Sequence, residues 1–362
     1  MNNIDFAEFF RTLEKGGHPF AMYRFPGEDT VNVIIDSAPG LNILSDPDRE
    51  KGFVFAPFAS DTLPSVLISP SVVTAFPVSG LPEAEIPGNA PFDCGDDTGA
   101  REEYEKLVRT AVNEINEGGV KKIVASRTLR MDYRKADFAG MFAAIVRRYP
   151  EAMAYYFSHP QIGRWMGATP ELLLLRRGGS LHTMSLAGTM PFSGGQKYSW
   201  DKKNVEEQAV VSLAIGEAFE NNAVEHVKVT EPGNHCAGPV VHLCSHISGR
   251  ETLATDFGKL LSDLAPTPAL SGYPKKAAMA FLSSYEKHSR AFYGGYLGEV
   301  NMSGDRTAEL YVNIRCMQIH DDHLTLYAGG GITGMSDPSS EWDETCRKIR
   351  AVGSIASHFI SR

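Results

Sequence analysis

Short apolar runs bounded by glycine, proline or aspartate recur along the chain, and each of them predicts a β-strand. Residues 152–192 contain three such runs in succession, with little but glycine and proline between them. The expected strands cover residues 20–25, 31–35, 52–58, 65–68, 120–130, 152–160, 163–177, 180–189, 227–230 and 240–248, with a terminal hairpin formed by 310–320 and 323–328.

Apolar positions three and four residues apart predict the helices, and glycine or proline marks several of their ends. The first helix stops at Gly16-Gly17, and the helix over 138–148 is followed by Pro150. The expected helices cover residues 4–15, 98–117, 138–148, 200–221, 256–264, 275–289 and 340–360.

Strand runs adjoin one another more often than they alternate with helices. This order favours an α+β fold with antiparallel sheets flanked by helices over a doubly wound parallel sheet. Residues 70–98 are proline-rich and acidic, which predicts a long ordered loop or linker. This stretch is the one candidate for an internal boundary, and we expect residues 1–362 to form a single domain.

The composition excludes several classes of function. The formal net charge of −9 argues against non-specific nucleic-acid binding. No apolar run approaches the roughly 20 residues of a membrane span, and the N-terminus lacks a signal-peptide core. The five cysteines are odd in number and scattered, which is typical of a reducing compartment. We therefore expect a cytoplasmic protein without a membrane or nucleic-acid partner.

Residues 327–348 combine features that suit an anionic ligand. Four glycines (Gly329, Gly330, Gly331 and Gly334) predict a turn whose main-chain N–H groups can approach a ligand closely. Asp337-Pro338 then reads as an N-cap with proline in the first helical turn. On that helix Glu344 and Lys348 share a face. The alternative interpretation is an ordinary exposed pair, worth a few tenths of a kcal/mol.

The same glycines match the dinucleotide-binding spacing G-x-G-x-x-G, but their context is wrong. That fingerprint belongs to a βαβ unit in which a second strand follows the helix. After Gly334 the chain reads as a single helix, and the strand before the glycines is the return arm of a hairpin. We therefore exclude a Rossmann site here.

Three charged side chains outside this stretch are candidates for chemistry. Glu207 lies at the edge of an apolar helix stripe and is either a solvated carboxylate or, with Glu344, a Mg²⁺ ligand. Lys122 lies on one face of a strand, where loss of hydration suits a general base. An edge-strand lysine that opposes aggregation is the alternative. Glu171 precedes four leucines, so it is either a protonated general acid or the polar end of a buried strand.

A cluster of histidines and cysteines is a candidate zinc site, but the spacing of these residues does not support it. Structural zinc sites usually present paired ligands such as C-x₂-C. The candidates here lack such pairs and are His235, Cys236, His242, Cys244 and His246.

Nine segments, in order, resemble the isochorismate synthases of the chorismate-utilising enzymes and cover about the last 250 residues. Residues 99–362 correspond to the catalytic core, and residues 1–98 match weakly. The segments are KIVASR (122–127), GATPELLL (167–174), LAGT (186–189), KNVEEQ (203–208), VHLCSHISG (241–249), PTPALSGYPK (266–275), YGGYLG (293–298), VNIRC (312–316), and YAGGGI with EWDETCRK (327–332 and 341–348).

The resemblance implies a two-layer antiparallel β-sandwich flanked by helices, with chorismate as substrate and Mg²⁺ held by Glu207 and Glu344. Lys122 would activate a water that attacks ring C2, while Glu171 protonates the departing C4 hydroxyl. The product, isochorismate, would serve menaquinone or siderophore biosynthesis, and a monomer would suffice. The remaining residues implied to bind substrate are Gly188, Thr189, Ala269, Tyr293, Arg315, Gly329 and Lys348.

Some positions distinguish relatives within this family. The aminating anthranilate synthases carry glutamine in place of Lys122, and aminodeoxychorismate synthases carry lysine in place of Ala187. Ala269 resembles isochorismate synthases more than salicylate synthases. Three features depart from the family pattern: Ala265 and Gln208 each replace a common histidine, and the loop between LAGT (186–189) and the following helix is short. The alternatives are a salicylate synthase, which also eliminates pyruvate, and a non-catalytic carboxylate-binding module.

Overall fold

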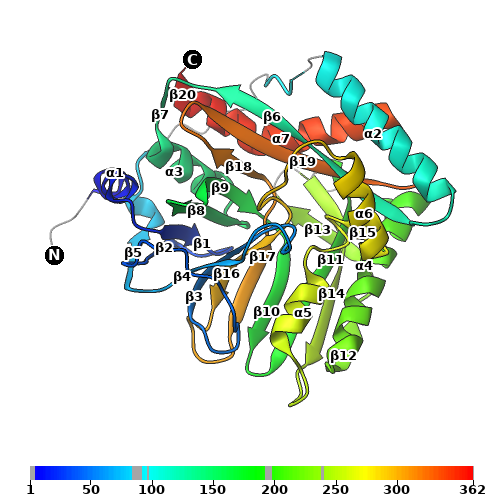
Figure 1. Cartoon of the computed structure of the whole chain (residues 1–362), viewed down its shortest axis with the longest axis horizontal. Coiled ribbons are helices and arrows are strands. Elements are labelled where there is room, and N and C mark those ends of the chain that lie inside the picture. Colours follow the sequence, from blue (N-terminus) through cyan, green and yellow to red (C-terminus); the bar gives the residue numbers. More distant parts are fainter. Residues whose placement is uncertain (1–4, 84–91, 96–97, 192–197, 238–239, 362) are drawn as a thin grey trace.

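Two nine-stranded sheets form the centre of the molecule, and every strand pair in the described part of the chain is antiparallel (Figure 1). The computed structural model describes residues 5–83, 92–95, 98–191, 198–237 and 240–361. The first sheet has the order β15 (Gly272–Tyr273), β6 (Lys122–Asp132), β19 (His323–Ile332), β18 (Cys316–Ile319), β9 (Gly163–Thr169), β8 (Met153–His159), β1 (Phe20–Arg24), β2 (Thr30–Ile35) and β5 (Val72–Pro77).

The second sheet packs against the first. Its strand order is β12 (Glu225–Val229), β14 (Val240–Arg250), β11 (Ser180–Pro191), β10 (Leu172–Arg177), β17 (Ala308–Val312), β16 (Tyr296–Val300), β3 (Gly52–Ala56) and β4 (Val66–Ile68), with β13 (Gly233–Ala237) paired to β14. Aromatic rings from both sheets interlock between them. Phe55 of the second sheet stacks on Phe157 of the first at 4.2 Å and on Phe292 at 4.5 Å. Such stacking adds to the burial of apolar area that holds the two layers together.

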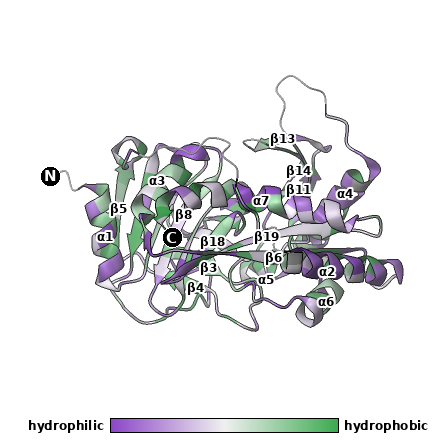
Figure 2. Ribbon diagram, turned by 90° about the horizontal axis from the view of Figure 1, so that it is seen from above, coloured by the Kyte–Doolittle hydropathy of each residue, from purple (hydrophilic) through white to green (hydrophobic). Residues whose placement is uncertain are grey.

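Helices cover the sheets on the outside. Helices α1 (Phe6–Gly16), α3 (Phe138–Arg148) and α7 (Pro338–Phe359) enclose a second apolar core against the other face of the first sheet. Helix α4 (Lys202–Asn221) packs on β11 and β14. In Figure 2 the hydrophobic colouring concentrates in the strands, and the hydrophilic colouring lies on outer helix faces. The remaining helices are η1 (Val78–Gly80), α2 (Thr98–Asn116), α5 (Phe257–Leu264) and α6 (Lys275–Tyr285), and β7 (Lys135–Ala136) pairs with β20 (Ile360–Ser361).

This architecture confirms the predicted α+β fold with an antiparallel sandwich and flanking helices, but two of the predicted strands are wrong. The run 163–177 is divided into β9 and β10, and the run 310–320 into β17 and β18. At each break the chain leaves one sheet and enters the other. Glu171 lies at the first break and Arg315 at the second, so two expected site residues occupy the two crossings.

Two further expectations differ from the structure. The glycines 329–331 lie inside β19, where they pair with residues 124–126 of β6, and not in a turn. The proline-rich stretch contains β5, which pairs with β2 at six positions. Residues 84–91 and 96–97 of that stretch lie outside the described part of the chain.

Candidate active site

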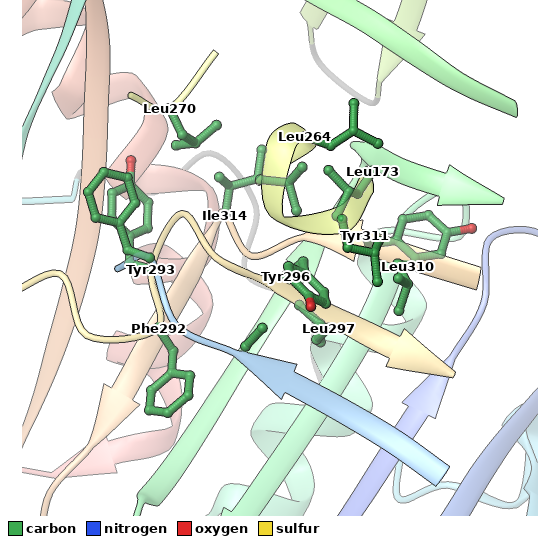
Figure 3. Close-up of a cluster of buried hydrophobic side chains, with 14 of the residues drawn as sticks. Leu173, Leu264, Leu270, Phe292, Tyr293, Tyr296, Leu297, Leu310, Tyr311 and Ile314 are labelled. Atoms are coloured by element: carbon green, nitrogen blue, oxygen red, sulfur yellow. The ribbon is translucent and has the colours of Figure 1, made fainter. Parts of the chain in front are cut away.

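A cavity of about 210 Å³ brings together nine of the eleven expected site residues. Of the other two, Lys122 contacts the wall residue Glu207, and Thr189 lies on β11 with a side chain outside the described part. Figure 3 shows Leu270, Tyr293 and Ile314, which line this cavity, as members of a cluster of buried hydrophobic side chains. The expected residues in the wall are Glu171, Gly188, Glu207, Ala269, Tyr293, Arg315, Gly329, Glu344 and Lys348.

Lys122 and Glu207 form an ion pair at one wall. The Lys122 side chain is 2% exposed, and its Nζ lies 2.9 Å from Glu207 Oε1. Gly331 of β19 passes directly beside them: a Cβ atom at this position would overlap Glu207 Oε1 and lie 3.0 Å from Lys122 Cε. A side chain at position 331 would displace the Glu207 carboxylate, so glycine makes room for the ion pair here, which is a different reason from the ligand contact predicted from the sequence.

Helix α7 supplies the opposite pair of charges. Its N-cap is confirmed, because Asp337 accepts a hydrogen bond from the Ser340 N–H at 2.9 Å. Lys348 Nζ donates to Glu344 Oε1 at 2.5 Å and to the Gly329 carbonyl at 2.8 Å. Both side chains are largely shielded and face the cavity, so they are part of its wall and not an ordinary exposed pair.

Glu171 is a buried carboxyl group, which is one of the two alternatives that the sequence left open. It is 5% exposed, and its carboxyl group makes no hydrogen bond to any described residue. Burial raises the pKa of Glu171 to about 7, although Lys122 and Arg315 lower it. The group is therefore partly protonated near neutral pH, which is the state that a general acid requires.

Arg315 lies immediately before β18 and has a backbone φ of 51°. Left-handed backbone is uncommon for a residue with a side chain, and it often occurs at functional sites. The guanidinium group lines the cavity and makes no ion pair or hydrogen bond with the residues that the structure describes. Burial lowers its pKa from the usual value for arginine, but the group stays charged. It is therefore a fixed cation available to an anionic ligand.

Gly188 and His242 form a part of the wall for which sequence analysis proposed only the glycine. Gly188 has a φ of 69° and lies where the register of β11 and β14 shifts. His242 Nδ1 lies 2.9 Å from the Gly188 carbonyl oxygen. Burial, together with the charge of Arg315, lowers the pKa of His242 to about 4, so the imidazole is neutral at pH 7.

Tyr293 and Ala269 close another side of the cavity. The Tyr293 ring stacks on Tyr327 at 5.4 Å, and burial raises the pKa of its hydroxyl, so it remains protonated. A Cβ atom at Gly329 would lie 2.8 Å from the Ala125 carbonyl oxygen and 3.1 Å from the Tyr293 hydroxyl oxygen, so a side chain here would force the backbone apart. The first turn of α4 adds Asp201 and Asn204, which sequence analysis did not single out.

The two glutamates proposed as metal ligands fit Mg²⁺ in the chemistry of their donors. Both carboxylates line one cavity, and a lysine ammonium group lies beside each of them. Among the described residues no group of three or more histidine, cysteine, aspartate or glutamate side chains could hold a metal. Mg²⁺ is usually coordinated by one or two carboxylates together with water and an anionic substrate, so two glutamates suffice as its protein ligands.

Comparisons with known proteins give a family match and several relatives. A family model described as chorismate binding enzyme matches residues 75–354. The isochorismate synthase EntC of Escherichia coli K12 is 27% identical over 255 residues, which are 68% of this chain and 65% of EntC. Anthranilate synthase component 1 of Haloferax volcanii is 29% identical over 299 residues, which are 75% of this chain and 54% of that protein. The match thus spans less than two thirds of either relative.

The fold has a counterpart among solved structures. The crystal structure of DhbC from Bacillus anthracis, a proposed 2,3-dihydroxybenzoate-specific isochorismate synthase, superposes with a TM-score of 0.78 at 22% identity. The superposition covers 96% of this chain and 99% of DhbC. Within the described residues, no helix is both long and apolar enough to cross a membrane.

Proposed function

The chain belongs to the family of chorismate binding enzymes, and from this premise we propose that it is an isochorismate synthase. The observation that carries the proposal is a buried carboxyl group with a pKa of about 7, Glu171, on a cavity that also holds the Lys122–Glu207 pair. A protein that only bound a carboxylate would have no need for an acid held protonated near neutral pH.

In the proposed reaction, water adds at ring C2 of chorismate and hydroxide leaves from C4 as the ring double bond shifts. Lys122, after its ammonium group has lost a proton to become the neutral amine, accepts a proton from the attacking water, and Glu171 gives a proton to the departing hydroxyl. One water enters and one leaves, so the product is an isomer of the substrate. A positioned acid or base of this kind typically contributes 10²–10⁴-fold to a rate.

Fixed charges suit a substrate with two carboxylates. Arg315 is a cation without a partner among the described residues, and its planar fork matches a carboxylate. Lys348 is held against Glu344 and the Gly329 carbonyl, which keeps its ammonium group at the wall. We assign Arg315 to the enolpyruvyl carboxylate and the side bearing Glu344 to the ring carboxylate.

Mg²⁺ would be held by Glu207 and Glu344. When bound, it neutralises the negative charge of the anchored ring carboxylate. The protein's own contribution is to present the two carboxylates from α4 and α7 at the wall of one cavity, with Gly331 leaving the space that Glu207 occupies.

The test is the product formed from purified protein, chorismate and Mg²⁺, followed by chromatography. We expect a mixture of chorismate and isochorismate that is reached from either compound, because the two isomers are similar in energy. Glu171→Gln serves as the inactive control. No pyruvate should be detected with lactate dehydrogenase, and no anthranilate fluorescence should develop with ammonium.

Other outcomes would identify other functions. Stoichiometric pyruvate with salicylate would show a salicylate synthase. Fluorescent anthranilate would contradict the role of Lys122. Binding of chorismate without turnover would show a carboxylate-binding module.

A further inference from the structure

Gln208 is a buried amide beside Glu207 on helix α4. Among the described side chains of residues 202–210 it is the only buried one, with 2% exposure. The second half of the helix is held by ordinary apolar packing of Val211, Ile215 and Phe219. The half that carries Glu207 is therefore attached to the sheet mainly through a polar side chain.

Three hydroxyl groups surround the Gln208 amide. Its Nε2 lies 2.8 Å from Ser185 Oγ on β11, 2.9 Å from Ser245 Oγ on β14 and 3.0 Å from Ser212 Oγ on the same helix. Ser185 and Ser212 also contact each other at 2.7 Å. A hydrogen-bonded cluster of this kind fixes both the orientation of the helix and its distance from the sheet, whereas apolar contacts allow the helix to slide over the strands. It holds α4 in one register over two strands.

That register determines where Glu207 lies. Glu207 must reach Lys122 Nζ at 2.9 Å, and its Oε1 occupies the space left by the missing Cβ of Gly331. There is little room for the helix to shift without separating the pair. Asp201 and Asn204, one to two turns earlier on α4, line the same cavity.

We infer that Gln208 is a positioning residue, which holds the Glu207 carboxylate beside Lys122 and where it can bind Mg²⁺. The inference rests on the proposed function, since Glu207 is its assumed metal ligand. Gln208 does not touch the cavity and acts only through its neighbour. An amide suits this place because it supplies hydrogen bonds without adding a charge beside Glu207 at any pH.

The test compares two buried amides at opposite ends of α4. Gln208→Met keeps the volume and removes the hydrogen bonds. Asn222→Leu is the matched control: Asn222 is 4% exposed and hydrogen-bonds the Ala218 carbonyl and Asp263, far along the helix from Glu207. Both variants should lower the melting temperature to a similar extent, because each loses buried hydrogen bonds.

Only Gln208→Met should also change the metal response. We expect the MgCl₂ concentration for half-maximal chorismate turnover to rise at least about 10-fold, the effect typical of losing a supporting neighbour of a metal ligand. MgCl₂ should raise the melting temperature of the wild type. Gln208→Met should need an MgCl₂ concentration higher by a comparable factor to reach the same rise. Turnover at saturating MgCl₂ should fall much less.

A third variant separates positioning from mere stability. Gln208→His can donate one hydrogen bond when neutral, so near pH 8 it should recover most of the Mg²⁺ response. Below about pH 6 the imidazolium adds a positive charge beside Glu207, and the response should be lost, as histidine titrates in this range. The wild type should show no such additional titration.

Equal metal responses in Gln208→Met and Asn222→Leu would overturn the inference, as would a wild-type melting temperature insensitive to MgCl₂. Failure of the proposed function is recognised separately. In that case the wild type binds MgCl₂ in the thermal assay but does not convert chorismate.

Discussion

At the scale of single residues, Glu171 is held where ionisation is costly. It lies at the crossing between β9 and β10, with apolar neighbours and no hydrogen-bond donor among the described residues for its carboxylate. The folded protein therefore favours its protonated form. This preference links activity to stability, because a charge forced on Glu171 weakens the fold.

The stability of Glu171→Gln should exceed that of the wild type at alkaline pH. The folded pKa is raised from 4.5 to about 7, so the favourable contribution of the protonated group is complete below about pH 4.5 and is lost as pH rises through 7. The loss amounts to about 3 kcal/mol at pH 8, and glutamine does not suffer it. Urea unfolding at pH 4 and pH 8 measures this: the variant should gain only at pH 8. Parallel stability curves would contradict the raised pKa.

The acid and base roles predict a loss of rate with little loss of affinity. Lys122→Ala and Glu171→Gln should each lower kcat by roughly 10²–10⁴-fold. Lys121→Ala is the matched control, since Lys121 is exposed and adjacent to Lys122. Steady-state kinetics and chorismate binding by calorimetry separate the two quantities. A near-normal kcat in either variant would remove that residue from its role.

At the scale of elements, helix α7 and strand β19 form one part of the cavity wall and are joined by a hydrogen bond. The helix carries Glu344 and Lys348 on one face, and β19 presents the Gly329 carbonyl to which Lys348 donates. The glycines of β19 let α4 and α7 approach the strand closely: Gly331 lies against Glu207, and a Cβ atom at Gly330 would lie 2.9 Å from Glu341 Oε2.

Glu344→Gln should abolish turnover and leave the fold intact. The substitution keeps the shape and removes one negative charge from the proposed Mg²⁺ site. Asp343→Asn is the control, because Asp343 is exposed and precedes Glu344 on the same helix. Turnover measured against MgCl₂ concentration should be normal in the control and absent in the variant. Full wild-type activity in excess chelator would show that no metal is needed.

The sequence predicted most elements but not the places where strands change sheets. Helix α3 matches its predicted bounds, because its apolar periodicity and its end before Pro150 are local features. The run from 163 to 177 is apolar on both sides of Pro170, and burial in two different sheets leaves the same pattern as burial in one. A crossing is set by tertiary packing, which the order of apolar residues does not record.

The site residues were predictable mainly through their motifs. The four leucines after Glu171 indicated a buried strand but left open whether its carboxyl group is buried, and the pairing of Lys122 with Glu207 joins residues from separate elements and has no local signature. His242 was considered only as a zinc ligand. Its place in the cavity depends on the register between β11 and β14, which shifts near Gly188.

At the scale of the whole molecule, both sheets contribute to one cavity. Glu171 and Arg315 lie at two of the places where the chain passes from one sheet to the other, and helices α4 and α7 add Glu207 and Glu344. That residues 1–362 form a single domain stays a prediction.

The longest ladder of the first sheet, β6 with β19, has a consequence for synthesis of the chain. It pairs residues 123–132 with residues 323–332, so β6 leaves the ribosome roughly 190 residues before its partner is made. At about 5–20 residues per second this is a delay of roughly 10–40 s, during which the facing edges of β6 and β9 lack the strands between them. Unpaired strand edges of this kind invite aggregation. The nascent chain therefore has to be kept apart from its neighbours until β18 and β19 are translated, and yield in the cell should depend on chaperones that bind during translation.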